Sequence, residues 1–321
     1  MKKRGYESKI VIPPAHRIGI SRNQARREYL KIILLLSKND VVFLQNSIFS
    51  TYFIVLICLV KLIFRPTLIL DFDDATWVQN PIAPRIVAFF SDKFIVASHY
   101  LTSWAPLQGK PIMVMANLVD YSLAERYGVN KERKTVVLGW IGNGPLSLQN
   151  MEILVPVFKE LVKRGIRFTF KLVGTLSDRY PHKSKELINL FTISGVETVF
   201  VDSLEWGKDG EIQKANSSFD VGLCPLLDSV SNRARCSLKV LDYMAAGIPV
   251  VISPVGEHLY FVDEGENGFL PKTVLEWVDA LEKLITDNRL RKLMGRASLE
   301  KLKKEFSYQA NIEKYIDFLG L

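Results

Sequence analysis

The stretch SLKVLDYMAAGIPVVISPVGE, residues 237–257, contains the pattern that decides the fold. Apolar residues recur at helical spacing up to Gly247, and the β-branched run that follows is typical of a buried strand. A helix that stops at a glycine and leads at once into an apolar strand is characteristic of parallel sheets covered by helices. Lys239 and Asp242 stand out in this helix, because burying an unpaired charge is costly.

The same alternation of apolar runs and helical patterns extends along almost the whole chain of 321 residues. Strands are predicted at residues 9–14, 41–45, 67–73, 93–98, 111–117, 135–141, 167–173, 197–201, 219–224, 248–253 and 268–270. A polar stretch at 120–134 separates these strands into two series and is the predicted linker. The sequence therefore predicts an α/β protein with two doubly wound, Rossmann-like domains facing a cleft.

Composition limits the classes of function. The three cysteines fit neither a disulfide framework nor a metal site, and the four histidines are scattered, so we expect a reducing compartment and no zinc. Residues 1–31 carry nine Lys or Arg against two acids, a net charge of +7. Such a basic end suits an anionic membrane or plain solvent, and without interleaved aromatic residues it gives no reason to expect nucleic acid.

Residues 48–64, IFSTYFIVLICLVKLIF, are apolar enough to raise the question of a membrane segment. The stretch is at the short limit for spanning a bilayer and contains Lys61. We expect a buried or half-buried helix of the α/β fold, and the alternative is a helix that rests on a bilayer beside the basic residues 1–31. No signal peptide is recognisable, so the expected location is cytoplasmic, with peripheral contact at the inner membrane face.

A glycine loop follows the predicted strand 135–141. It consists of Gly142, Asn143 and Gly144 and leads into a helix expected to begin near Ser147. Glycines let a backbone approach a ligand closely, and the amides of a helix start attract phosphate or sugar oxygens. The spacing does not match the dinucleotide-binding fingerprint, and a tight turn with Ser147 as N-cap explains the residues equally well.

A second candidate site includes the opening stretch. A polar loop with Arg233 and Arg235 precedes it, and a helix begins at about Ser237. If this helix start points at a diphosphate, its amides and Lys239 supply charge-assisted donors, and Asp242 can accept hydrogen bonds from ribose hydroxyls. In the alternative, Lys239 and Asp242 are solvated surface residues and Ser237 is a simple cap.

The end of another predicted strand carries acids in the stretch DFDDATW, residues 71–77. Asp73 or Asp74 could contact an acceptor hydroxyl or a sugar hydroxyl, whereas helix capping and turn formation are the structural alternative. A pair of such acids can also hold a divalent metal on a nucleotide diphosphate. His99 follows a further strand end and is a minor candidate of the same kind.

The run from Phe219 to Leu270 resembles the donor-nucleotide half of the retaining GT-B glycosyltransferases known as glycosyl transferases group 1, or family 4. The family helix reads roughly L-E-A-M-A-x-G-x-P-V-V, and residues 241–251 read LDYMAAGIPVV. The later family pattern G-G-x-x-E-x-V-x-D-G-x-N-G-x-L corresponds to PVGEHLYFVDEGENGFL at 254–270. The resemblance extends over roughly 135–305, whereas residues 1–117 match only in architecture.

The resemblance implies a nucleotide-sugar site built from three loops. The residues that it assigns to donor binding are Gly142, Asn143, Gly144, Ser237, Leu238, Lys239, Asp242, Gly256 and Glu257. Asp242 stands where a family glutamate binds the ribose, and the residues from Ser237 to Lys239 stand where helix-start amides hold the diphosphate. Glu257 and its neighbour His258 lie in a loop that contacts the donor sugar in the family.

Two departures from the family pattern concern charge. The other family glutamate, eight positions before Asp242, corresponds to Ala234, so the usual carboxylate contact to the sugar is missing. The basic residues that commonly follow the glycine loop are missing as well. We expect Arg233, Arg235 or Lys239 to supply the positive charge instead.

The resemblance implies a transferase that moves a sugar from a nucleotide-diphosphate sugar to an acceptor with retention of configuration, without a cofactor or divalent metal. Residues 1–119 would bind the acceptor, residues 135–305 the donor, and a helix at 306–321 would pack back on the first domain. The basic start suggests a lipid-linked or growing-glycan acceptor, in cell-surface polysaccharide or glycolipid synthesis. A nucleotide-sugar epimerase and a catalytically silent nucleotide-sugar-binding partner subunit, consistent with Ala234, remain as alternatives.

Overall fold

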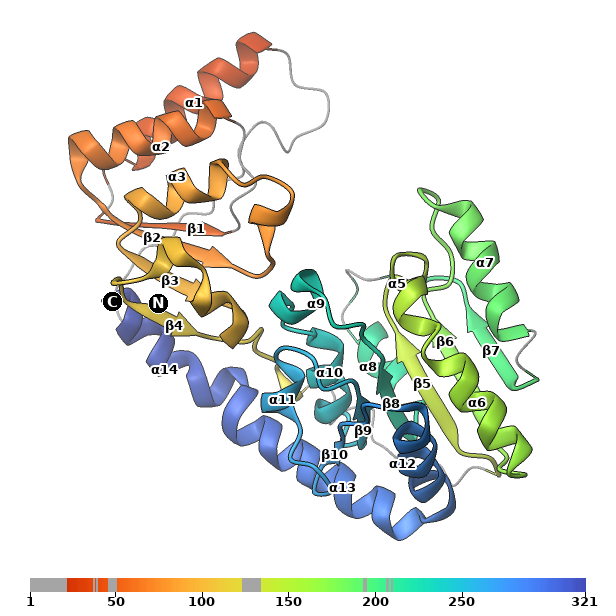
Figure 1. The fold of residues 1–321 in the computed structure, drawn as a ribbon. Helices are drawn as coiled ribbons and strands as arrows, with labels where there is room; N and C mark the ends of the chain where they lie inside the picture. The colour runs from red at the N-terminus through yellow and green to blue at the C-terminus, as the bar shows by residue number, and fades with distance from the viewer. Residues whose placement is uncertain are drawn as a thin grey trace. The chain divides into compact units, whose positions relative to one another are not determined.

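The structure is a computed structural model of the 321-residue chain. It describes residues 22–36, 38, 40–45, 51–122, 134–192, 195–205, 208 and 210–321. The strand predicted at 9–14, most of the predicted linker and the first 21 residues of the basic start lie outside these ranges. The described residues form two compact units, each built on a parallel sheet (Figure 1).

The chain passes between the two units more than once. The first unit contains the described residues up to Ala116 together with Arg233–Cys236 and Ile312–Leu321, and the remainder forms the second unit. Two details differ from the predicted division. Arg233–Cys236, which we had placed in the donor domain, belong to the first unit, and the C-terminal return to that unit begins at Ile312 rather than near 306.

The first unit has a four-stranded parallel sheet in the order β1-β2-β3-β4. Its strands are β1 Val41–Gln45, β2 Thr67–Phe72, β3 Lys93–Val96 and β4 Ile112–Val114. Side chains alternate between the two faces, as β2 illustrates: Leu68, Leu70 and Phe72 point into the main core, and Ile69 points to the opposite face.

Helices cover both faces of this sheet (Figure 1). The main core lies under α1 Arg22–Leu36, α2 Thr51–Phe64 and α3 Ala83–Phe90, and the opposite face is covered by α14 Tyr308–Leu319. Short 3-10 turns complete the unit: η3 Thr76–Val78, η4 His99–Ser103 and η5 Ala105–Leu107. The apolar stretch 48–64 therefore supplies a helix of the α/β fold, as expected. No helix within the described ranges has the length and apolar character needed to cross a bilayer.

The second unit has a six-stranded parallel sheet in the order β10-β9-β8-β5-β6-β7. Its strands are β5 Val137–Ile141, β6 Thr169–Val173, β7 Glu197–Val201, β8 Val221–Cys224, β9 Val250–Ile252 and β10 Gly268–Phe269. The chain builds outward from β5 to β7, then returns to the other side of β5 and builds outward through β8 to β10. This reversal makes the sheet doubly wound, and ligands of such sheets bind beyond the strand ends at the point of reversal.

Helices also cover both faces of the second sheet. The helices of the second unit are α5 Gly144–Met151, α6 Leu154–Lys163, α7 Pro181–Thr192, α8 Glu211–Asn216, α10 Leu238–Ala245, α11 His258–Phe261, α12 Val274–Thr286 and α13 Asn288–Lys301, with a π-helical turn at Leu302–Phe306. A further short helix, α9 Val230–Ala234, ends in the segment Arg233–Cys236 that belongs to the first unit. One face is filled mainly by α5, α6, α7 and α12. On the other face, the ring of Tyr243 in α10 packs directly on Gly222 of β8, where a larger side chain would not fit. The two helix-covered parallel sheets confirm the predicted α/β class.

Candidate functional site

The carboxyl ends of β5 and β8 lie side by side where the strand order of the second sheet reverses. The glycine loop follows β5, and the chain leading to α10 follows β8. Tyr243 of α10 ties these ends together, since its hydroxyl accepts a hydrogen bond from the Ile141 amide at 3.1 Å and donates one to the Leu223 carbonyl at 3.4 Å. Two stretches that the sequence singled out separately are thus joined at one edge of the sheet.

Lys239, in the first turn of α10, lies at this edge. Its Nζ is 3.8 Å from the centre of the Trp140 ring, a cation–π contact. A Cβ built on Gly142 would lie only 2.8 Å from the same Nζ, and Gly142 has a φ of 152° that residues with side chains rarely adopt. The glycine therefore leaves room for an ammonium group that is held against the indole at the end of β5.

The helix after the glycine loop begins earlier than predicted. It starts at Gly144, and its N-cap is Asn143, whose Oδ1 accepts a hydrogen bond from the Leu146 amide at 3.3 Å. Ser147, which we considered as the cap, lies within the first turn. The prediction was wrong on this point because an asparagine beside two glycines satisfies the helix start at least as well as a serine does.

The backbone amides of the glycine loop are largely in use. Gly142 and Gly144 donate to the carbonyls of Val173 and Gly174, at 3.1 and 2.9 Å. The Asn143 amide has no hydrogen-bond partner among the residues that the structure describes. The loop thus offers one amide to a ligand, and its main contribution to the site is the space that Gly142 leaves for Lys239.

The start of α10 has an unusual backbone. Its N-cap, Ser237, is in the left-handed region with φ 53° and ψ 50°, and its side chain makes no capping hydrogen bond. A left-handed residue with a side chain is strained by roughly 1–2 kcal/mol. Because the Ser237 side chain makes no capping hydrogen bond, the simple-cap interpretation is wrong. The first amides of a helix have no acceptor within it, and Leu238 and Lys239 carry those amides here.

Asp242 lies further along α10 and is half-buried. Burial raises its pKa from 3.8 to about 7, and its carboxyl makes no hydrogen bond to any residue of the described ranges. Hydrogen bonds donated to a carboxylate favour its charged form. A ligand with hydroxyl groups would therefore satisfy a group that the protein itself leaves unsatisfied.

The loop after β9 contributes a buried histidine. Nδ1 of His258 lies 2.7 Å from the Ser253 carbonyl, and because a carbonyl only accepts, Nδ1 carries the proton. Nε2 is buried and has no partner in the described part of the chain, so it presents a lone pair. Burial, together with the charge of Lys239, lowers the pKa of His258 to about 4. Next to it, Glu257 is only 2 % exposed, and Gly256 has a left-handed φ of 57°.

Arg233 and Arg235, expected beside Lys239, belong to the first unit together with Ala234. Ala234 is fully buried in the core of that unit, and its carbonyl accepts a hydrogen bond from Ser98 Oγ at 2.8 Å. A glutamate at this position would have to bury its carboxylate among apolar side chains, which is costly. Packing thus accounts for the departure from the family pattern.

The acids proposed for catalysis also lie in the first unit. Asp73 and Asp74 are exposed and follow β2, and neither caps η3, whose N-cap is Ala75. Burial of part of the carboxyl and the charge of Asp73 raise the pKa of Asp74, while Arg235 lowers it. The grouping of Asp74 with Arg235 in one unit is a relation that sequence alone did not indicate. His99 is exposed and begins η4.

Sequence reasoning missed three groups. Trp140 and Tyr243 have the pattern of ordinary core residues. The Trp140 ring, however, positions Lys239, and the Tyr243 hydroxyl joins the ends of two strands. Asp71, on the α14 face of β2, has a pKa raised to about 7 by burial and by Asp73. An acid inside an otherwise apolar strand was the available signal for Asp71.

A second unit wound like a Rossmann fold, preceded by another parallel α/β unit, is the architecture of the GT-B class. Residues 135–287, a little under half of the chain, match the sequence model of the family described as glycosyl transferases group 1.

Among curated proteins, sulfoquinovosyl transferase SQD2 of Arabidopsis thaliana is 28% identical over 174 residues, which are 50% of this chain and 32% of that protein. Trehalose synthase of Pyrococcus horikoshii is 31% identical over 91 residues, 28% of this chain and 22% of that protein. The chain thus spans a third or less of the length of these relatives.

Solved structures share the fold over nearly the whole chain. HepE of Anabaena, in complex with UDP and glucose, superposes with a TM-score of 0.71 at 17% identity and covers 95% of this chain and 84% of its own. Sucrose-phosphate synthase of Thermosynechococcus elongatus gives 0.70 at 14% identity, covering 93% and 79%. At these identities the likeness establishes the GT-B fold.

Proposed function

We propose that the chain is a glycosyltransferase that takes a sugar from a nucleotide-diphosphate sugar bound by the second unit. One observation carries the proposal. Lys239 Nζ lies 3.8 Å from the centre of the Trp140 ring, beside Gly142, at the point between β5 and β8 where the strand order of the second sheet reverses. That is the place where doubly wound sheets bind nucleotides. The complexes of HepE with UDP and with UDP-glucose support the same donor class.

In the proposed reaction, the bond between the sugar and the diphosphate breaks and a new bond forms to an acceptor hydroxyl. Lys239 and the amides at the start of α10 stabilise the negative charge that grows on the departing diphosphate. The acceptor approaches from the same side and gives its proton to that diphosphate, so configuration is retained. Positive charge comes from the protein in this scheme, and no divalent metal takes part.

Two further groups have roles in the same site. Asp242 accepts hydrogen bonds from the ribose hydroxyls, and these bonds return its raised pKa toward the ordinary range. The buried lone pair on His258 Nε2 accepts from a hydroxyl of the donor. Both groups are acceptors, and both lie in the second unit with Lys239, which supplies the donors.

The acceptor in this proposal is a lipid-linked or growing glycan bound by the first unit, at the cytoplasmic surface of a membrane. Its support is the basic character of residues 1–31 and the resemblance to enzymes that assemble glycans.

A donor panel tests the function. The protein is incubated with UDP-, GDP- and ADP-sugars, with and without membrane extract, and nucleotide release and labelled products are followed. We expect release coupled to transfer from one donor, unaffected by EDTA, with the anomeric configuration preserved by NMR. Lys239→Gln should abolish transfer, whereas Lys292→Gln, an exposed lysine in α13, should not.

The other outcomes identify the alternatives. Isomerised sugar without transfer would indicate an epimerase. Tight donor binding without turnover would indicate a silent partner subunit, in agreement with alanine at position 234. Equal donor affinity of the Lys239→Gln variant and the wild type would contradict the proposed site itself.

A further inference from the structure

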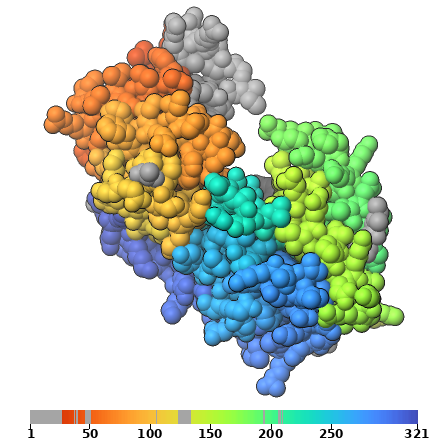
Figure 2. Space-filling model, viewed as in Figure 1, coloured from red at the N-terminus to blue at the C-terminus, as the bar shows by residue number. Residues whose placement is uncertain are grey.

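The first unit exposes an apolar surface on its outer helices. The inner residues of α2 are buried in the main core, but the helix is apolar all round, and its outer side is open to solvent. The exposed apolar residues of α2 are Tyr52, Val55, Leu59, Leu62, Ile63 and Phe64. In the space-filling view, atoms of this part of the chain, in red to orange, lie at the surface of the unit (Figure 2). A helix with this pattern normally has its outer side covered.

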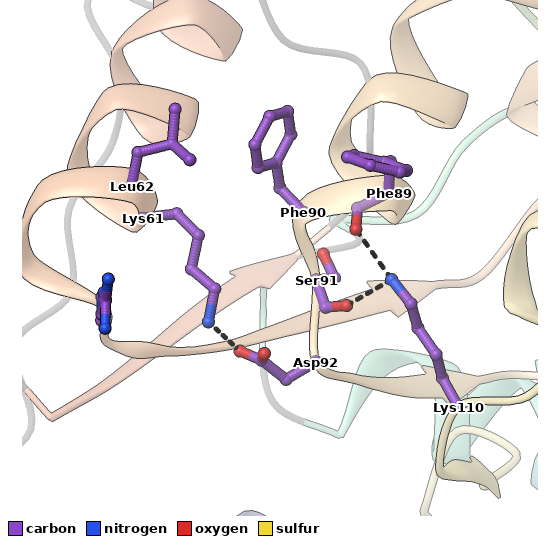
Figure 3. A pocket seen from close by; sticks show the side chains of 8 residues that line it. Lys61, Leu62, Phe89, Phe90, Ser91, Asp92 and Lys110 are labelled. Atoms are coloured by element: carbon purple, nitrogen blue, oxygen red, sulfur yellow. Dashed lines mark hydrogen bonds and ion pairs between the residues drawn. The ribbon is translucent and has the colours of Figure 1, made fainter.

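The surface continues onto α3. Ile82, Ile86 and Phe89 recur at helical spacing there and are exposed, Phe89 by 75 %. An open pocket of about 670 Å³ lies between the two helices. Its apolar lining consists of Leu62 of α2 and of Phe89 and Phe90 at the end of α3 (Figure 3). We call the exposed apolar residues of α2 and α3, with this pocket, the outer surface.

The sequence that contains α1 and α2 is strongly basic. Residues 1–65 contain 12 Lys or Arg and three acids, a net charge of +9, whereas the whole chain has +8, so the rest of the chain is at −1. Within α1, α2 and α3 the one acid is Glu28, and it is paired with Lys31 at 3.0 Å. Arg85 lies exposed between Ile82 and the rest of the α3 surface.

Three basic residues line the pocket, and two of them are paired with other described residues. Lys61 pairs with Asp92, and Lys110 donates to the carbonyls of Phe89 and Ser91 at the end of α3 (Figure 3). Lys110 also donates to the Ala88 carbonyl. Arg65 is exposed, and its guanidinium makes no hydrogen bond or ion pair to any described residue. It is the lining residue that is available to an anion.

The backbone of Arg65 supports a role for its side chain. Its φ is 55°, and its amide donates to the Lys61 carbonyl, so it ends α2 in the left-handed position where glycine is preferred. An arginine is strained there relative to glycine. Strain of this kind is a reason to look for a function of the side chain.

We infer that the outer surface rests on an anionic bilayer, with apolar side chains of α2 and α3 in the interface and Arg65 bound to lipid phosphate. The 14 residues of α2 rise about 21 Å, less than the roughly 30 Å of a bilayer core, so the helix lies on the membrane. Apolar residues beside unopposed arginines match an anionic interface better than a purely apolar protein partner. The inference rests on the proposed function only for its setting, and its test involves no sugar.

Vesicle binding of the full chain tests the inference. Sedimentation is measured with phosphatidylcholine vesicles and with vesicles of equal parts phosphatidylcholine and phosphatidylglycerol. We expect binding to the anionic vesicles that weakens with salt. Phe89→Ser and Leu62→Ser should each weaken it by about tenfold. Leu275→Ser should not, although Leu275, on α12 of the second unit, is as exposed as Leu62.

Arg65→Gly separates binding from folding. The substitution relieves a strained backbone, so the melting temperature should stay the same or rise, while affinity for anionic vesicles falls about fivefold. Arg296→Gln, an exposed arginine of α13, serves as the control for charge. Equal binding to both vesicle types, or full binding by Arg65→Gly and Phe89→Ser, would overturn the inference. So would a wild-type dimer that Phe89→Ser converts to monomer without changing vesicle binding, because the occupant would then be a second copy.

Discussion

The substitution Gly142→Ala tests whether the glycine loop acts by making room for Lys239. The new Cβ would lie 2.8 Å from Lys239 Nζ and 3.0 Å from the Trp140 ring. The lysine end is flexible and can move away, so the steric effect on folding should be small. The φ of 152° adds a backbone cost of about 1 kcal/mol. We therefore expect a mildly destabilised protein with a displaced ammonium group.

The effect on the donor should be larger than the effect on stability. A hydrogen bond to a charged group is worth about 1.5–3 kcal/mol, which corresponds to roughly 10- to 150-fold in the dissociation constant. Titration calorimetry with the donor nucleotide measures this loss, and urea unfolding measures the stability. Gly165→Ala is the matched control, because Gly165 has a φ of 76° with nothing within 4 Å of its Cβ and precedes the amino end of β6.

A double-mutant cycle decides the mechanism. If Gly142→Ala acts by displacing Lys239, then adding it to Lys239→Met should change donor affinity little further. Full additivity of the two losses would refute the reasoning, and so would wild-type affinity in Gly142→Ala alone. Additivity would mean that the loop contributes to donor binding by some means other than positioning the lysine, and wild-type affinity would mean that the space at Gly142 is not needed for donor binding.

Three other substitutions follow from the same structure. Asp242→Asn should gain stability over the wild type as pH rises from 4 to 8, by at most about 4 kcal/mol. The reason is that the folded pKa of Asp242 is raised to about 7, so the wild type loses stability when this carboxyl ionises, whereas asparagine does not titrate. If burial were not the cause, urea unfolding at both pH values would show a constant difference between the two proteins. Tyr243→Phe should cost about 1–3 kcal/mol, since it leaves the buried Ile141 amide without its acceptor, and an unchanged urea midpoint would contradict this. Ala234→Glu should destabilise the chain by about 3 kcal/mol or more rather than add a sugar contact, and a stable variant with tighter donor binding would show the opposite.

Much of the fold could be predicted because its signals are local. The apolar runs of β5, β8 and β9 and the helix that stops before Gly247 follow from periodicity and from one glycine. The position of Lys239 over Trp140 could not be predicted, since it depends on how α10 meets the end of β5, a tertiary relation between residues far apart in sequence. The capping by Asn143 rather than Ser147 was a local choice between two adequate caps, which propensity alone does not resolve.

The assignment of Arg233 and Arg235 shows a second kind of limit. Both lie within the stretch that resembles the donor half of the family, so the sequence placed them with the donor site. The side chain of Ala234 is buried in the core of the first unit, its carbonyl accepts a hydrogen bond from Ser98, and the segment Arg233–Cys236 belongs to that unit. A short excursion of the chain leaves no periodic signal, because four residues are too few to show one.

The position of Ser237, where the chain enters the second unit, bears on the role of its strained backbone. Ser237 is the residue at which the chain leaves the segment Arg233–Cys236 of the first unit and enters α10 of the second. Strained residues persist where the surrounding structure determines them, and here Tyr243 anchors the helix that follows Ser237 to two strand ends of the second unit. Tyr243 therefore holds α10 against the second sheet, so the first amides of α10, which follow the left-handed Ser237, point in one direction within the second unit. A nucleotide diphosphate bound there would meet donors that were oriented before it arrived, which lowers the entropic cost of binding.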